Sequence, residues 1–229
     1  MLEALLLLAV LVAAPHSAGA VHPGVDATPT PATAPAPRGA ATADETLKAL
    51  FEGGRTFRDF LGAARRRTEL WNRLAAEGTV APEAVARARA VGGTWRILAV
   101  AEDWCGDSAH NIPYVAKLVE EVEGVELRII NSNAGRTLME AHRTPDGRPA
   151  TPTLILLDTA WNEVGCFVER PSPLMAWYMD NVADKSPDEV HEHVLDFYAA
   201  DQGQATVEDV VQLLEAAAAG EPRCAVGAG

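Results

Sequence analysis

The chain has 229 residues, of which 48% are hydrophobic and 22% are charged, a composition typical of a soluble globular protein. It contains 19 lysines and arginines and 32 aspartates and glutamates. The net charge of −13 argues against a protein that follows nucleic-acid phosphates or binds anionic lipid. Three cysteines are too few for a disulfide-framework miniprotein or a four-cysteine zinc site, and their odd number leaves at least one thiol free or paired with another molecule.

The first 43 residues are not expected to belong to the folded domain. Residues 4–14 form an apolar run too short to span a bilayer, and Ala18-Gly19-Ala20 resembles a signal-peptidase site. We predict a signal peptide over residues 1–20, export to the periplasm or the extracellular space, and no stable membrane insertion after cleavage. The segment before the apolar run has no lysine or arginine, so a cytoplasmic protein with a misassigned start codon is the alternative. Residues 21–43, rich in proline, alanine and threonine, predict a disordered linker.

Three helices are predicted next, over residues of about 42–52, 57–74 and 82–91. Thr42 and Glu45 have the spacing of a capping box, and Pro82 occupies a first-turn position. The basic run at 65–67 falls inside the second helix. We interpret it as part of a solvated helix face.

The pattern then changes to short apolar strands separated by helices. We expect strands at 95–101, 125–130, 153–157 and 164–168, and helices at 105–123, 138–142, 187–198 and 207–218. Ser186 and Thr206 are the expected caps of the last two helices, and residues 220–229 are expected to form a flexible tail. A helix links the first two strands, which should therefore be parallel, whereas the last two form a hairpin. The fold class is α/β, with a mixed central sheet flanked by helices.

Cys105 is the residue that points most directly to chemistry. It lies where the first strand ends and a helix begins. Unpaired backbone N–H groups and the helix dipole favour an anion at a helix N-terminus, so they favour the nucleophilic thiolate form.

Several separated motifs around Cys105 carry a resemblance to a known family. Residues 104–108, Trp-Cys-Gly-Asp-Ser, resemble the Trp-Cys-Gly-Pro-Cys motif of the thioredoxin superfamily. Pro113 matches the helix-kinking proline of that family, and Pro152 in Thr151-Pro152-Thr153 matches its cis-proline. Residues from about 42 to 218 are similar to a little-characterised bacterial group of thioredoxin family proteins with the element Glu-Asp-Trp-Cys-Gly-Asp.

The resemblance implies a thioredoxin-like domain over residues 44–219, with helical extensions at both ends and Cys105 as the catalytic residue. The implied site consists of Trp104, Gly106, Asp107 and Ser108 in the motif, with Thr151, Pro152 and Arg170 in a substrate groove. Arg170 would favour the thiolate or bind a partner carboxylate; a simple surface arginine is the alternative.

The departures from the family motif bear on activity. Ser108 replaces the resolving cysteine, and a hydroxyl cannot release substrate from a mixed disulfide. Asp107 places a carboxylate beside the thiol, which disfavours the thiolate. Ala99 stands where many thioredoxins carry a buried acid, so Glu102 or Asp103 would have to accept the proton.

The other cysteines and the histidines leave alternatives open. Cys166 is either a buried small hydrophobic residue or the resolving partner of Cys105, and Cys224 could also form a disulfide. His191 and His193 point in different directions on a helix, so we expect no metal site, and no motif predicts a cofactor.

Three hypotheses follow. In the first, Cys105 exchanges disulfides with proteins or low-molecular-weight thiols and an external thiol resolves the adduct. In the second, the protein is a redox-inactive module that binds a peptide or protein. In the third, the protein is a redox sensor in which Cys105 and Cys166 form a reversible disulfide.

Overall fold

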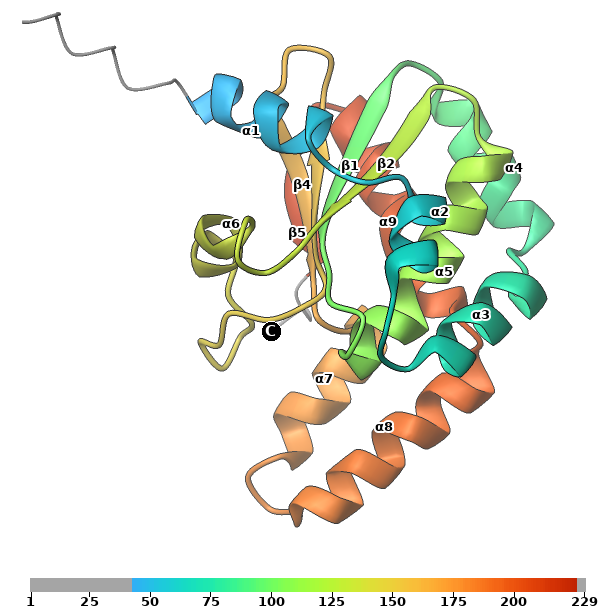
Figure 1. Cartoon of the computed structure of the whole chain (residues 1–229), viewed down its shortest axis with the longest axis vertical. Coiled ribbons are helices and arrows are strands. Elements are labelled where there is room, and N and C mark those ends of the chain that lie inside the picture. The colour runs from blue at the N-terminus through green and yellow to red at the C-terminus, as the bar shows by residue number, and fades with distance from the viewer. Residues whose placement is uncertain (1–42, 226–229) are drawn as a thin grey trace, which may run out of the picture. The chain divides into compact units, whose positions relative to one another are not determined.

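The computed structural model of the chain describes residues 43–225 (Figure 1). The predicted signal peptide, the linker up to residue 42 and the capping residue Thr42 lie outside them. The fold is built around a five-stranded sheet with the order β2-β1-β3-β4-β5. The strands are β1 (Trp95–Val100), β2 (Val125–Ile130), β3 (Thr153–Leu157), β4 (Glu163–Val168) and β5 (Arg223–Ala225).

The strand directions confirm the predicted mixed sheet. β1 and β2 are parallel, β3 runs antiparallel to both β1 and β4, and β5 is parallel to β4. Because side chains alternate along a strand, each apolar strand supplies both faces of the sheet. In β1, Ile97 and Ala99 pack on one face, whereas Leu98 and Val100 pack on the other.

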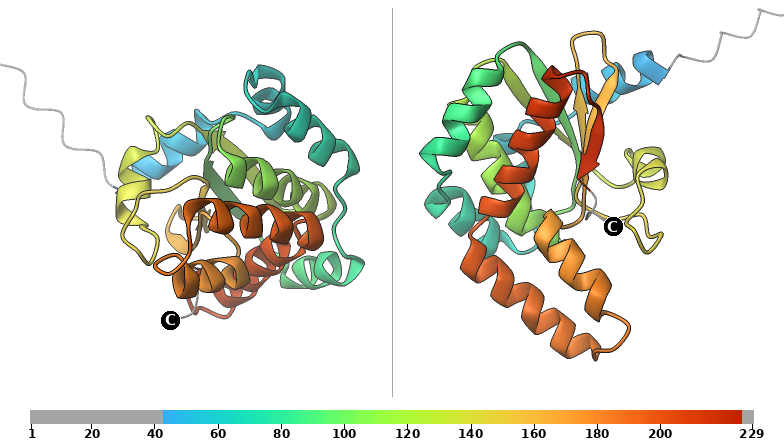
Figure 2. Two further views of the ribbon diagram at one scale, coloured as in Figure 1. Left: turned by 90° about the horizontal axis from the view of Figure 1, so that it is seen from below. Right: turned by 180° about the vertical axis from the view of Figure 1, so that it is seen from behind.

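Helices cover both faces of the sheet, as Figure 2 shows from behind. The face with the larger hydrophobic cluster carries α2 (Phe57–Ala63), α3 (Thr68–Glu77), α4 (Pro82–Val91), α5 (Gly106–Glu121) and α9 (Gln204–Ala218). The opposite face carries α1 (Ala43–Glu52) and α6 (Arg136–Ala141). The α/β layering expected from the sequence is therefore present in the described residues.

Two antiparallel helices, α7 (Ser172–Asn181) and α8 (Pro187–Asp201), form a hairpin that projects from one end of the sheet (Figure 1). The hairpin has a small core of its own around Leu174, Val194 and Tyr198. The Ser186 cap of α8 is confirmed, with a capping box to Glu189. Helix α7 was not predicted from the sequence.

Three local predictions are wrong. The helix expected over 57–74 is divided into α2 and α3, because Arg67 adopts a left-handed backbone conformation (φ 47°). Thr206 does not cap α9. Gly203 precedes the helix with a φ of 78°, and Thr206 is buried in its first turn. The loose tail expected after residue 219 is wrong for residues 223–225, which pair with β4 as β5.

Candidate functional site

Cys105 occupies the junction between β1 and α5 that the sequence predicts. It is the N-cap of α5 and has an extended backbone (φ −78°, ψ 125°). The backbone N–H of Ser108 donates to its sulfur at 3.4 Å. The thiol in turn donates to the carbonyl of Thr151 at 3.1 Å, directly before the cis peptide bond to Pro152. The sulfur is a free thiol, half-buried between a helix N-terminus and the cis-proline loop.

The residues before Cys105 are fixed by the segment that joins α2 to α3. The indole N–H of Trp71 donates to the carbonyl of Asp103 at 2.9 Å, and the Nε of Arg67 donates to the carbonyl of Trp104 at 2.7 Å. The Asp103 carboxylate accepts the backbone N–H groups of Arg65 and Arg66 at 2.6 and 3.1 Å. The basic run is exposed, as expected, but it lies between two helices rather than on a helix face, and the side chain of Arg67 reaches the active-site motif. The Trp104 side chain is left 56% exposed.

Asp107 forms an ion pair with Arg170, so the structure brings these two predicted site residues together. The nearest oxygen and nitrogen atoms are 3.3 Å apart, and both side chains are largely buried. The hydroxyl of Tyr198 donates to the other Asp107 oxygen at 2.7 Å. The carboxylate charge beside the thiol, expected to disfavour the thiolate, is thus compensated by a neighbouring cation and a hydrogen bond.

Burial determines the protonation of the groups around Asp107. Burial raises the pKa of Tyr198 well above its usual value, and the neighbouring Asp107 raises it further, so the phenol remains a donor. Burial alone would lower the pKa of Arg170, but the charges of Asp107 and Glu169 outweigh it and raise that pKa. The Arg170 guanidinium therefore remains charged at neutral pH.

Asn111 joins the active-site helix to the elements that follow β4. Its fully buried side-chain amide donates to the carbonyl of Glu169 at 3.1 Å and to the Tyr198 hydroxyl at 3.3 Å. Its side-chain oxygen accepts from the hydroxyl of Thr206 at 2.5 Å. One side chain thus connects α5, the end of β4, α8 and α9. Sequence analysis did not identify Asn111, since nothing local distinguishes it from a solvated helix residue.

An Asn111→Ala variant is expected to lose about 3 kcal/mol of unfolding free energy, because buried polar partners are left without hydrogen bonds. Urea unfolding of the purified protein would measure this loss. Asn181→Ala is the matched control, since the amide of Asn181 donates only to the nearby Trp177 carbonyl, and its expected cost is about 0.5 kcal/mol. Equal losses in the two variants would contradict the connecting role of Asn111.

His110 lies one residue before Asn111, and its ring is stacked on Tyr198 with the ring centroids 4.4 Å apart. Burial, with smaller contributions from the positive charges of Arg73 and Arg67, lowers its pKa from 6.5 to about 4. The imidazole is therefore neutral at pH 7.

The unfolding free energy is expected to fall by about 2 kcal/mol between pH 6.5 and pH 4 because of His110. In this window the unfolded chain protonates the imidazole and the folded chain does not, so the contribution is complete above pH 6.5 and lost below about pH 4. The full pKa shift of His110 would correspond to a larger loss of unfolding free energy. We expect a smaller loss because the ring is only partly buried and solvent screens its charge. A His110→Phe variant keeps the stacking and removes the titration. Urea unfolding at a series of pH values should show a flatter profile for this variant, and parallel profiles would refute the assignment.

Comparison with known proteins agrees with this geometry. A family model described as thioredoxin matches residues 54–186, which is more than half of the chain. The chain belongs to the thioredoxin family. No curated protein gives a significant match.

Two solved structures are similar to this thioredoxin family protein in fold. One is an HIV epitope scaffold, with 21% sequence identity, a TM-score of 0.57 and coverage of 73% of this chain and 96% of its own. The other is a Pseudomonas aeruginosa protein of unknown function, with 22% identity, a TM-score of 0.55 and the same coverage. At this identity the likeness supports the fold alone.

Ser108 marks the main departure from the dithiol motif of thioredoxins. Its side chain is fully buried, and its hydroxyl has no hydrogen-bond partner within the described residues. Position 108 therefore holds a buried hydroxyl without a hydrogen bond in the described residues. It has no thiol that could resolve a mixed disulfide at Cys105.

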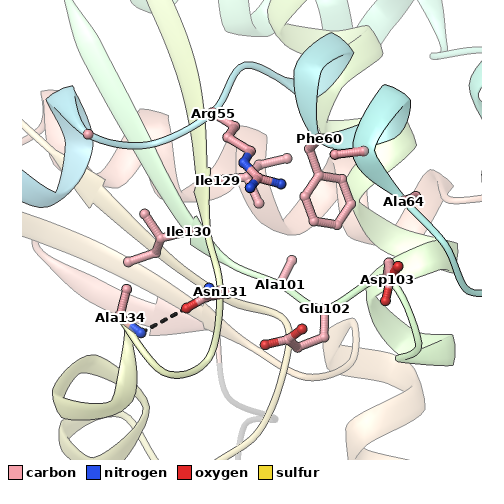
Figure 3. Close-up of a pocket in the computed structure, with 12 residues that line it drawn as sticks. Arg55, Phe60, Ala64, Ala101, Glu102, Asp103, Ile129, Ile130, Asn131 and Ala134 are labelled. Atoms are coloured by element: carbon pink, nitrogen blue, oxygen red, sulfur yellow. Dashed lines mark hydrogen bonds between the residues drawn. The ribbon is translucent and has the colours of Figure 1, made fainter.

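Glu102 and Asp103, the candidate proton acceptors, lie around a cavity of about 390 Å³ that Arg55 and Phe60 also line (Figure 3). Glu102 accepts hydrogen bonds from the backbone and hydroxyl of Ser132 at 2.8 and 2.5 Å. Cys105 does not line this cavity, and its thiol bonds to the Thr151 carbonyl instead. Neither carboxylate replaces the buried acid of other thioredoxins through a direct bond to the sulfur.

Cys166 is not a resolving partner of Cys105. It forms a disulfide with Cys224 of β5. The alternation of side chains along β4 places Cys166 on the sheet face covered by α1 and α6, whereas α5 packs on the other face. The redox-sensor hypothesis built on Cys105 and Cys166 is therefore wrong.

The histidines expected not to bind metal have other environments. His193 stacks on Trp177 with the ring centroids 3.5 Å apart, whereas His191 faces a cavity beside α7. Over residues 43–225, no group of three or more histidine, cysteine, aspartate or glutamate side chains could hold a metal ion. No helix in the same range is long and apolar enough to cross a membrane.

Proposed function

We propose that this thioredoxin family protein performs monothiol thiol–disulfide exchange with Cys105 as the nucleophile. The observation that carries the proposal is the position of the free sulfur, between the N–H of Ser108 at the start of α5 and the carbonyl before cis-Pro152. The helix N-terminus stabilises negative charge on the sulfur, and the Asp107 carboxylate that would oppose it is paired with Arg170.

The exchange proceeds in two balanced steps. The Cys105 thiol releases its proton to solvent, and the thiolate attacks one sulfur of a disulfide. A bond forms between Cys105 and that sulfur, the substrate S–S bond breaks, and its electron pair leaves with the other sulfur as a thiolate. A second, external thiol then attacks the mixed disulfide and regenerates Cys105, since position 108 supplies no thiol.

The Thr151–Pro152 backbone and the Trp104 side chain would orient the substrate. The Thr151 carbonyl accepts the thiol hydrogen bond, and the exposed indole of Trp104, one residue before Cys105, offers an apolar surface. Arg170 acts on the Cys105 site through Asp107 rather than by touching the sulfur.

The test is intact-mass spectrometry after incubation with a small disulfide such as bis(2-hydroxyethyl) disulfide. One adduct is expected on the wild-type protein and none on Cys105→Ser. The same adduct on both proteins, or none on either, would reject Cys105 as the nucleophile. Addition of 2-mercaptoethanol should reverse the adduct.

A second candidate is a redox-inactive module that binds a peptide or protein without turnover. The large exposed surface of Trp104 supports this reading, because exposed aromatic side chains are frequent anchors at interfaces. The pH dependence of Cys105 alkylation separates the two. A thiol that reacts no faster at neutral pH than free cysteine favours the binding module, and an accelerated one favours exchange.

We further propose that the protein works in an oxidising compartment after export. The Cys166–Cys224 disulfide supports this, since such bonds persist mainly in exported proteins. Alkylation of intact cells with a thiol reagent before lysis would leave Cys166 and Cys224 unmodified if this proposal holds. Modification of both would support the cytoplasmic alternative.

A further inference from the structure

A cavity of about 450 Å³ lies between the first turn of α5 and the α7–α8 hairpin, and we call it the hairpin cavity. Gly106 and Asp107 of the active-site motif line one side, and α8 residues between Pro187 and Tyr198 line the other. Figure 1 shows the hairpin projecting from the end of the sheet at which α5 begins. The cavity is within the size range of small-ligand sites, and Gly106, which lines it, directly follows Cys105 in the chain.

The hairpin cavity is positively charged in a strongly acidic protein. Arg67, Arg170 and Lys185 line it, and Asp107 is the one carboxylate among its lining residues in the described part of the chain. Both oxygens of Asp107 are already engaged, one by Tyr198 and the other by Arg170. His110 adds no charge at neutral pH, since its pKa is about 4. The cavity therefore attracts an anion although the whole chain carries −13.

Two guanidinium groups at the cavity retain unused donors. The Nη2 of Arg170 contacts Asp107 and Glu169, but its Nε and Nη1 have no hydrogen-bond partner within residues 43–225. This side chain is only 12% exposed, and its guanidinium lies 4.3 Å from the ring centre of Tyr178. The Nε and Nη1 atoms are covered by protein atoms, so Arg170 contributes positive charge to the cavity rather than direct hydrogen bonds to a ligand.

Arg67 places its guanidinium at the motif itself. A Cβ atom on Gly106 would lie 3.8 Å from the central carbon of that guanidinium. Its Nε is used by the Trp104 carbonyl, and the group forms no ion pair with a carboxylate of the described residues. Arg67 thus contacts Trp104 and lies beside Gly106, the two residues that flank Cys105 in the chain.

The opposite wall of the hairpin cavity is apolar. Val182, Val190 and Val194 contribute to it, and the side chain of Leu195 is 45% exposed there. An anion with a short hydrocarbon segment therefore fits the cavity better than an inorganic ion does. The limited volume favours a small molecule over a folded partner.

We infer that the hairpin cavity binds the carboxylate end of a small anionic disulfide and so directs its sulfur atoms to Cys105. This inference rests on the proposed exchange function and specifies its substrate class. The carboxylate pairs with Arg67 in the positive field of Arg170 and Lys185, the hydrocarbon part lies against α8, and the disulfide reaches the N-terminus of α5. The chemical step is the one given above, with a carboxylate-bearing thiolate as the leaving group.

The test compares three linear disulfides that differ mainly in charge: the dianion 3,3′-dithiodipropionate, neutral bis(2-hydroxyethyl) disulfide and the dication cystamine. The rate of adduct formation at Cys105 is divided by the rate at which 2-mercaptoethanol reacts with the same disulfide. This normalisation removes differences in the intrinsic reactivity of the three disulfides. For the wild-type protein we expect a normalised rate about tenfold higher for the dianion than for the neutral compound, with cystamine slowest. The preference should shrink at about 0.5 M NaCl, because salt screens exposed charges.

Arg67→Gln should lower the ratio of the normalised rate of the dianion to that of the neutral disulfide about fivefold. The neutral disulfide reports any damage to the motif caused by loss of the bond to the Trp104 carbonyl. Arg66→Gln is the matched control, since Arg66 contacts Asp103 through its backbone and does not line the cavity. Equal normalised rates for the three disulfides, or equal effects of the two variants, would overturn the inference while leaving exchange at Cys105 intact.

A binding measurement separates the inference from the chemistry. Cys105→Ser protein should be stabilised against heat by 3,3′-dithiodipropionate and not by cystamine, and Arg67→Gln in the same background should abolish this stabilisation. If wild-type protein forms no adduct with any disulfide, the exchange function fails, but this stabilisation would still support an anion site. No stabilisation, or stabilisation only by a disulfide-linked acidic peptide, would overturn the small-ligand inference.

Discussion

A Ser108→Cys variant is expected to raise the turnover of insulin reduction with dithiothreitol at least about tenfold. In the proposed exchange, the mixed disulfide at Cys105 of the wild-type protein is resolved only by an external thiol. A thiol at position 108 lies on the first turn of α5, whose N–H already contacts the sulfur of Cys105. Intramolecular attack replaces a bimolecular step, so release of the reduced substrate becomes faster. Precipitation of reduced insulin measures the turnover, and intact mass detects the internal disulfide.

Ser108→Ala is the control for this variant. It removes the same hydroxyl without adding a thiol, so turnover should remain at the wild-type level. Because the buried Ser108 hydroxyl has no partner within the described residues, its removal should stabilise the fold by about 1 kcal/mol. Formation of the internal disulfide in Ser108→Cys without a gain in turnover would count against exchange as the function of the site.

Loss of the Cys166–Cys224 disulfide is expected to lower the unfolding free energy by about 4 kcal/mol. The bond joins residues that are 58 positions apart, and closing a loop of that length restricts the unfolded chain. The double variant Cys166→Ala/Cys224→Ala and the wild-type protein in dithiothreitol should show the same loss in urea unfolding. Adduct formation at Cys105 should be unchanged, since Cys166 faces the other side of the sheet from α5.

Cys105→Ser serves as the control for the disulfide measurement. Its stability should depend on dithiothreitol in the same way as that of the wild-type protein, because Cys105 forms no bond with either cysteine. An unfolding midpoint that does not respond to the reductant would show that β5 contributes little to the fold.

Much of the fold could be predicted because its signals are local. Apolar runs between glycines mark the strands, and Ser186 with Glu189 marks the start of α8. The division between α2 and α3 could not be predicted, because it depends on bonds from Arg65 and Arg66 to Asp103, up to 38 residues away. Apolar spacing alone continues through this segment as if it were one helix.

The site was predictable only as far as the motif extends. The resemblance identified Cys105, Thr151 and Pro152, and the structure shows that the Thr151 carbonyl accepts a hydrogen bond from the thiol. Tyr198 was not identified, because its bond to Asp107 spans 91 residues and a tyrosine on a helix usually packs in a core. The contact of Arg67 with the active-site motif was not predicted for the same reason, since it depends on a hydrogen bond to the distant carbonyl of Trp104.

The bond from Tyr198 to Asp107 has a consequence for any attempt to shorten this protein. Joining β4 directly to α9 would yield a smaller chain whose sheet is unaltered. Such a truncation would remove both Arg170 and the Tyr198 phenol, leaving the Asp107 carboxylate without its ion pair and without that hydrogen bond. The α7–α8 hairpin is therefore part of the candidate site. A chain shortened in this way is expected to lose the proposed reactivity of the Cys105 thiol before it loses its fold.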